Sequence, residues 1–398
     1  MAITRIVRAT AAGLLTVGLS LTAAVAAQAA PAARPVQAVR SHEVAASGLA
    51  KLATYKFTLS RIGWNGSHIL IAATDTHGDL YFFWQKAGTT TWHKELVAEA
   101  GKKVTYRSPS VTWTGSSVAI AAVDKAGDLV YFGQKSGSSK WHYQRVAKAS
   151  GGKFSAPSVA AVAGGPVLIS ADTPSALVSY EQPAGSSTWT RLAVAAGSFG
   201  APSLVTCYDT LAAHYLALVA ATTSTHTLEF WWEFVSSPGW TEETIATGAY
   251  LGGSLAATSK DLLLTAETTS GGVDEWSQTI GGSGWTAQTV AGSSLGAPYK
   301  NPQIAWTGPT QTTETYDLIT ADQKGSLVFW WNYDGSTTSW QQEKVAGSGS
   351  RASYTSPAIS VTGKSVIITA VNTKGGDVDF WHQSYNTNPW KKQRVAKG

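Results

Sequence analysis

The sequence predicts an all-β fold, a seven-bladed β-propeller of four-stranded antiparallel blades. Three observations carry this prediction. A Trp-containing element recurs seven times at intervals of 45 to 55 residues. Each interval holds further runs rich in β-branched and aromatic residues, separated by turn residues and without helical periodicity. The first and last units are as regular as the middle ones, which favours a closed ring over a solenoid with atypical capping units.

The recurring element is Trp, four residues, Val or Ile, and then Ala, and it predicts the fourth strand of each unit. The Trp residues are Trp92, Trp141, Trp189, Trp240, Trp285, Trp340 and Trp390. The units span about 52–101, 102–150, 151–197, 198–248, 249–292, 293–350 and 351–398. Each unit holds four strands in order, so we expect blade seven to meet blade one without sharing a blade.

Three further elements recur in phase with this Trp. Strand one follows an aromatic residue and, in five of the seven units, a Pro three residues later, such as Tyr106 and Pro109. We expect the Pro at the first residue of the strand, where a missing N–H is tolerated. Strand two is a β-branched run such as 118–122, and a turn with Asp or Asn, often with Gly, leads to strand three. The fourth residue of strand three is aromatic in every unit, so we expect it, like the Trp of strand four, to pack between blades.

The next residue of strand three varies between units, and packing therefore does not dictate it. The seven residues are Trp84, Gly133, Glu181, Trp232, Ser277, Trp331 and His382. We predict Trp84, Trp232 and Trp331 as aromatic platforms for a ligand. The alternative is that they are partly buried residues of the outer strands.

A second set of candidates comes from strand direction. The loop entering strand one and the turn between strands two and three must lie on the same face of the disc. An aromatic ring beside a hydroxyl acceptor is typical of a glycan pocket, whereas the alternative is loop packing with a turn-capping Asp. The predicted pairs are Tyr106 with Asp124, Tyr299 with Asp322, and Tyr354 with Asn372.

The N-terminal residues predict a secreted protein. Residues 1–30 combine a basic start, an apolar stretch and a small-residue run before Pro31, which is typical of a signal peptide. Elsewhere no apolar run is long enough to predict a membrane span. Residues 31–51 predict an extended tail, either a linker or a docking peptide for a protein partner. The docking candidates in the tail are Arg34, Val36, Val39, Arg40 and Val44.

The net charge and the cysteine content further limit the expected ligands and cross-links. Five of the 30 Lys and Arg and one of the 25 Asp and Glu precede residue 52, so the remainder has a net charge of +1. This balance argues against nucleic-acid binding. Cys207 is the only cysteine, so no intramolecular disulfide forms, and its apolar flank predicts a buried thiol.

With its short Trp-rich repeats, the chain resembles the bacterial and animal propeller lectins. This resemblance covers all seven units and implies a non-catalytic protein that binds glycans or cell-surface ligands. It rests on architecture and repeat length, because the Asp box of sialidase-type propellers is not matched at 75–78.

Two alternatives belong to other classes. The layout of signal peptide, tail and single propeller also resembles an adaptor of the secreted umbrella toxin particles of actinobacteria. That resemblance implies a protein partner bound by the tail. A glycoside hydrolase is the third class, but no unit carries a catalytic insertion. His and Asp spacings predict no metal or cofactor, and we expect the propeller to be monomeric.

Overall fold

The structure, a computed structural model, describes residues 56–101, 104–150, 152–237, 239–292, 298–307, 315–322, 324–333, 340–384 and 389–398. The predicted signal peptide and tail lie outside these residues. All described residues belong to one compact unit, Ala46–Gly398. Within them no helix is long and apolar enough to cross a membrane.

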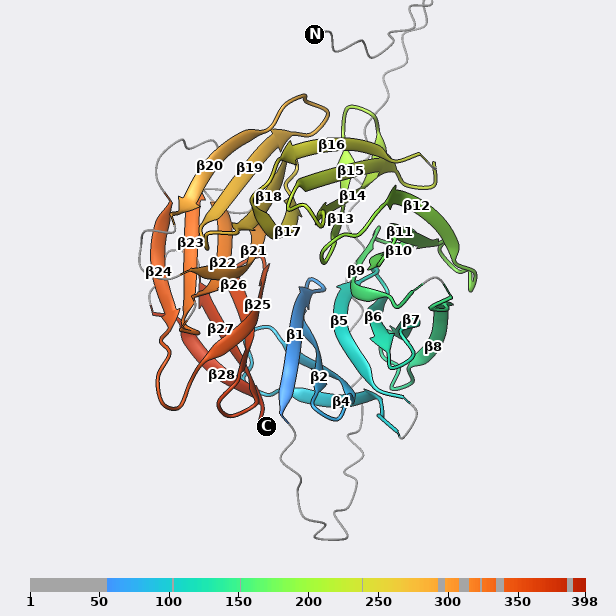
Figure 1. Cartoon of the computed structure of the whole chain (residues 1–398). Coiled ribbons are helices and arrows are strands. Elements are labelled where there is room, and N and C mark those ends of the chain that lie inside the picture. The colour runs from blue at the N-terminus through green and yellow to red at the C-terminus, as the bar shows by residue number, and fades with distance from the viewer. Residues whose placement is uncertain are drawn as a thin grey trace, which may run out of the picture. The chain divides into compact units, whose positions relative to one another are not determined.

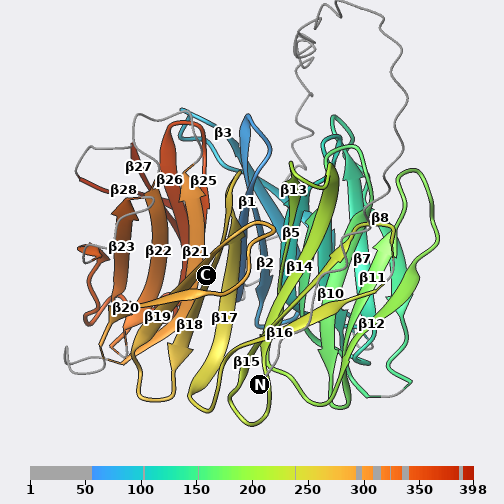
Figure 2. The ribbon, with the colours of Figure 1, turned by 90° about the horizontal axis from the view of Figure 1, so that it is seen from above.

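The described chain forms 28 strands in seven antiparallel sheets, and each sheet consists of four consecutive strands. The sheets surround a common centre as the blades of a propeller (Figure 1), and from the side their strands run between the two faces of the disc (Figure 2). This arrangement confirms the predicted fold.

Each blade contributes strands in the same order from the centre outward. The first strands are β1 (Phe57–Trp64), β5 (Tyr106–Trp113), β9 (Ser155–Ala161), β13 (Ser203–Asp209), β17 (Tyr250–Ala257), β21 (Tyr299–Thr307) and β25 (Tyr354–Val361). The second strands are β2 (His68–Asp75), β6 (Ser117–Asp124), β10 (Val167–Thr173), β14 (His214–Thr222), β18 (Asp261–Thr268), β22 (Thr315–Asp322) and β26 (Ser365–Asn372). The third strands are β3 (Leu80–Lys86), β7 (Leu129–Lys135), β11 (Ala176–Gln182), β15 (Leu228–Phe234), β19 (Val273–Thr279), β23 (Leu327–Tyr333) and β27 (Asp377–Ser384). The fourth strands are β4 (His93–Ala98), β8 (His142–Ala147), β12 (Thr190–Ala196), β16 (Thr241–Ala246), β20 (Thr286–Ala291), β24 (Gln341–Ala346) and β28 (Lys391–Ala396).

The ring closes by packing blade 7 against blade 1. The Phe57 N–H donates to the Gly376 carbonyl at 2.9 Å, and strand β1 lies against β25. An apolar cluster that includes Ile71 of blade 1 and Ile367 of blade 7 fills the joint. No sheet exchanges a strand across it, so closure occurs without a shared blade, as the sequence predicts.

The Pro residues of strand one are not at the first strand position, and that expectation is wrong. In blades 2, 6 and 7 the strand begins at the aromatic residue, and the Pro lies inside it where the register with strand two shifts. The residue before the Pro has a left-handed backbone, with φ of 51° at Ser108, 52° at Asn301 and 50° at Ser356. Pro tolerates this place because a bulge leaves its backbone nitrogen outside the ladder.

The residue after this bulge links neighbouring blades near the centre of the ring. In blades 2 to 5 it is Ser, and its hydroxyl accepts a backbone N–H from strand one of the next blade. The four bonds are Val159 N to Ser110 Oγ at 3.1 Å, Leu204 N to Ser158 Oγ at 3.0 Å, Leu255 N to Ser203 Oγ at 2.9 Å, and Ile304 N to Ser254 Oγ at 3.2 Å. By strand register, the equivalent residues of blades 1, 6 and 7 are Arg61, Gln303 and Ala358.

The Trp residues of strand four pack between blades, as expected. Trp92 lies edge-on against Phe380 of the preceding blade, with ring centroids 5.2 Å apart. Its indole N–H also donates to Gln393 Oε1 at 3.1 Å. Trp141 repeats this arrangement one blade further on, against Phe82 and Glu95. In blades 1, 2, 3 and 5 the repeated Trp therefore contributes both apolar area and a polar link between blades, whereas the indole nitrogens of Trp240, Trp340 and Trp390 have no hydrogen-bond partner among the described residues.

The only cysteine of the chain is buried, as its apolar flank predicts. Cys207 lies on β13 within the apolar cluster that joins blades 4 and 5. Burial, together with the nearby negative charge of Asp209, raises the pKa of the Cys207 thiol to about 12. The thiol therefore stays protonated at neutral pH and acts as a small apolar group.

Candidate ligand-binding groove

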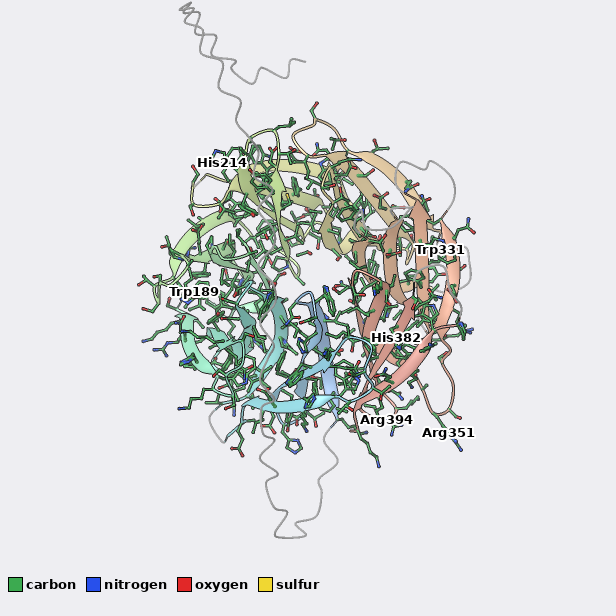
Figure 3. All side chains as sticks on the ribbon, turned by 180° about the vertical axis from the view of Figure 1, so that it is seen from behind. Trp189, His214, Trp331, Arg351, His382 and Arg394 are labelled. Atoms are coloured by element: carbon green, nitrogen blue, oxygen red, sulfur yellow. The ribbon has the colours of Figure 1, made fainter. Side chains whose placement is uncertain are left out.

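The variable residue of strand three faces the space between its own blade and the next one. Trp84 packs on the apolar cluster that joins blades 1 and 2, and Trp232 on the one that joins blades 4 and 5. Trp331 packs on the cluster that joins blades 6 and 7. Trp331 and His382 hold this position in consecutive blades (Figure 3). The size of the residue at this position of strand three therefore affects how far the space between two blades is filled.

The three Trp residues predicted as platforms are half-buried rather than exposed. Trp84 stacks on His93 with ring centroids 3.9 Å apart, and its indole N–H donates to Glu95 Oε1 at 3.1 Å. Trp331 stacks on Phe329 at 5.7 Å. Trp84 and Trp331 are thus held by neighbouring aromatic rings, and the role of the three residues in binding stays a prediction.

Between blades 7 and 1 the same position is His382, and the groove there is open. It encloses about 820 Å³. Trp64 and Ile69 line it from blade 1, and Phe380 and Lys391 line it from blade 7 together with His382. The turns 87–90 and 362–365 border the groove at its ends.

Fixed polar and aromatic groups shape the wall of this groove. Gln393 Oε1 accepts hydrogen bonds from Gln85 Nε2 at 2.8 Å and from the Trp92 indole at 3.1 Å, so its orientation is set. The Phe380 and His382 rings are stacked with centroids 5.8 Å apart. Burial first, and then the positive charge of Lys391, lowers the pKa of His382. At neutral pH its imidazole is uncharged and offers one donor and one acceptor.

The groove is basic. Lys392 forms an ion pair with the buried Asp379 at 2.7 Å, whereas no ion pair within the described ranges involves Lys364 or Lys391. Among the described residues, no Asp or Glu lines the groove. Nor do His, Cys, Asp and Glu of the described chain gather in any group able to hold a metal ion. The described lining of the groove is therefore formed by aromatic rings, an imidazole, an amide and two Lys side chains that are not ion-paired.

The predicted aromatic and carboxylate pairs do come together. Tyr106 lies opposite Asp124, Tyr299 opposite Asp322, and Tyr354 opposite Asn372 in the strand registers. They share one face of the disc, as strand direction requires.

These pairs are nevertheless engaged in packing and turn capping. Tyr299 and Tyr354 are buried, and their rings lie edge-on against the aromatic residues Trp330 and Trp381 of strand three. Asp322 Oδ1 accepts the Ser326 N–H at 2.7 Å across the turn. Asp124 accepts the Asp128 N–H in the same way, and Asn372 Oδ1 accepts the N–H groups of Ser353 and Lys374. Tyr106 is the most exposed of the three rings, and a binding role for these residues stays a prediction.

Sequence reasoning did not select Trp64, Lys391 or His382 as site residues. His382 belongs to the variable strand-three position, but large aromatic residues were favoured there. Gly133, Glu181 and Ser277 also lack a large ring at this position, so no pattern in the sequence singles out the groove beside His382. The predicted tail residues, Arg34, Val36, Val39, Arg40 and Val44, lie outside the described residues.

No protein-family model matches the chain, and neither does any curated protein. Solved structures do resemble it. The BP39L lectin of Burkholderia pseudomallei is similar with a TM-score of 0.67 and 14% identity over 85% of this chain and 100% of that one. The fucose-specific lectin of Aleuria aurantia has a TM-score of 0.50 and 13% identity over 86% and 96% of the two chains. AofleA of Arthrobotrys oligospora has a TM-score of 0.51 and 12% identity over 74% and 88%.

At these identities the likeness concerns the fold. The chain is a seven-bladed β-propeller whose structural neighbours include lectins.

Proposed function

We propose that this protein is a non-catalytic lectin that binds a glycan in the groove between blades 7 and 1. The observation that carries the proposal is the open groove beside His382, where three other blades place a Trp. We also propose that the protein acts outside the cell, on the strength of the signal-like residues 1–30.

The chemistry of the groove supports a sugar ligand. Trp64 and Phe380 supply aromatic surface for the apolar face of a sugar ring. The neutral imidazole of His382 and the amide of Gln393 supply hydrogen-bond partners for its hydroxyls. Lys364 and Lys391 make a neutral or acidic sugar a better electrostatic match than a basic one. Fucose, the sugar named for the Aleuria aurantia lectin, is the first one to test.

The test fills the groove without disturbing the blade. His382→Trp gives blade 7 the residue that blades 1, 4 and 6 carry, so we expect the fold to accept it. The indole should occupy the space of the sugar and weaken binding at least about tenfold. Glycan-array screening of the intact protein identifies the ligand, and calorimetric titration of that glycan measures the loss.

Two further variants locate the site. Trp64→Ala removes an aromatic wall of the groove and should weaken binding, whereas Trp113→Ala makes the same change between blades 1 and 2, where strand three carries Trp84, and should not. Full binding in both His382→Trp and Trp64→Ala would refute this site. Loss only with Trp84→Ala, Trp232→Ala or Trp331→Ala would move the site to the grooves of those blades.

A further inference from the structure

A second polar cavity lies at the centre of the ring, apart from the groove between blades 7 and 1. It encloses about 180 Å³ and is lined by residues of the first strands of six blades. Those strands surround the central opening (Figure 1). Arg61 of β1 is the only charged residue among its described lining residues, and Gln303 of β21 and four Ser residues contribute polar groups.

Arg61 departs from the repeat. Its position on β1 corresponds to Ser110, Ser158, Ser203 and Ser254 in blades 2 to 5. One hydrogen bond involves its guanidinium, from Nη1 to the Ser60 carbonyl at 3.2 Å. The ion pairs of the described residues do not include Arg61, and burial lowers its pKa. A guanidinium has five N–H donors, and the described residues provide one acceptor for those of Arg61, so donors of this lining residue remain for a ligand.

Other side chains of the cavity supply donors too. The hydroxyl oxygens of Ser110, Ser158 and Ser203 each accept a backbone N–H from the next blade. A hydroxyl that accepts in this way still carries its own proton to donate. The amide nitrogen of Gln303 donates one N–H to the Pro302 carbonyl at 2.8 Å, and its second N–H is a further donor. Since neither Asp nor Glu is among the described residues that line the cavity, their charge and hydrogen-bond donors are complementary to an anion.

We propose that this axial cavity binds a small oxyanion, a carboxylate or a tetrahedral anion such as sulfate, through Arg61 and the Ser hydroxyls. A buried charge is stabilised by a paired opposite charge, and the cavity has room for such an anion with attached water. The site joins residues from several blades, so a bound anion would hold the first strands together. It is independent of the proposed glycan groove.

The experiment measures binding of sulfate and of acetate to the full chain by equilibrium dialysis with labelled ions, at constant ionic strength set with chloride. The test variant is Arg61→Ser, which gives blade 1 the residue of blades 2 to 5 and should fold. Lys125→Ser is the matched control, because it removes one positive charge from an exposed turn. We expect one saturable site per chain in the wild type and in Lys125→Ser, and at least about tenfold weaker binding in Arg61→Ser.

Binding of only sulfate or only acetate also supports the site if it is weaker in Arg61→Ser and unchanged in Lys125→Ser. The ion that binds then shows whether the site prefers a tetrahedral or a planar anion. Equal binding by wild type and Arg61→Ser would overturn the proposal and leave an adventitious ion only. Absence of saturable binding of both ions to the wild type would overturn it as well. Circular dichroism of each variant checks that the fold is retained.

Discussion

Replacing Trp231 by alanine is expected to lower the free energy of unfolding of the propeller by about 3–5 kcal/mol. Trp231 is 1% exposed and is among the largest fully buried side chains of the described residues. It packs in the cluster that joins blades 3 and 4, edge-on against Phe199 at 5.4 Å. Alanine would leave a cavity at this joint that rigid strands on both sides cannot close. Urea unfolding followed by circular dichroism measures the loss.

Two controls make this prediction specific. Trp231→Phe places the residue that blades 1 and 2 carry as Phe83 and Phe132, and should lose less than half as much. The indole nitrogen of Trp231 has no hydrogen-bond partner among the described residues, so Phe leaves no acceptor unpaired. Leu211→Ala, at a side chain 85% exposed, should change stability by less than about 0.5 kcal/mol. Equal stability of Trp231→Ala and Leu211→Ala would contradict the packing described here.

The propeller is expected to become more stable as the pH falls from 8 to 5.5. Burial raises the pKa of Glu233 to about 7 and that of Glu275 to about 7. The two residues are 2% and 1% exposed. Glu181 faces Glu233 and raises its pKa further, while the Gly239 N–H lowers it in part. Gln288 Nε2 donates to Glu275 at 2.9 Å and partly stabilises its charged form.

The sign follows from proton binding. A carboxyl with a raised pKa binds its proton more tightly in the folded state than in the unfolded chain. Its stabilising effect is complete below the unfolded pKa of about 4.5 and is lost as the pH rises through the folded pKa of about 7. Each group thereby changes the free energy of unfolding by about 3 kcal/mol across this range.

Thermal unfolding between pH 5.5 and 8 provides the measurement. Glu233→Gln with Glu275→Gln should flatten the profile and stabilise the protein at pH 8, because a neutral amide replaces a buried charge. Glu99→Gln, at an exposed position, should leave the profile unchanged. A double variant with the slope of the wild type would show that other groups control the pH dependence.

The fold could be predicted from the sequence because every blade places a Trp in the space between itself and the preceding blade. Trp92, Trp141 and their equivalents occupy the same wedge between blades, so their spacing counts the blades. The bulge of strand one was not readable. Ser108, the residue before the proline, has a positive φ, and Ser110 just after the bulge bonds to the neighbouring blade; the sequence of one repeat does not reveal such contacts between blades.

The candidate site was readable only in part. The variable strand-three position marked the grooves between blades, but whether a groove is open depends on several side chains at once. Trp84 is held by His93 and Glu95, whereas His382 and Trp64 line an open groove. Arg61 belongs to none of the recurring sequence elements. Only the register of β1 with β2 shows that it occupies the position that is Ser in blades 2 to 5. The adaptor alternative depends on the tail and stays a prediction.

Because the ring closes without a shared blade, the positions at which the chain begins and ends could be changed without changing the strand pairs. Each sheet is formed by four strands that are consecutive in the chain. Lys56, the first described residue, and Gly398, the last, both lie directly against Gly376. A short peptide joining them would therefore allow circular permutation, with the chain cut between any two blades and all strand pairs kept. The packing of side chains between blades fixes the order of the blades around the axis. It does not fix at which blade the chain begins.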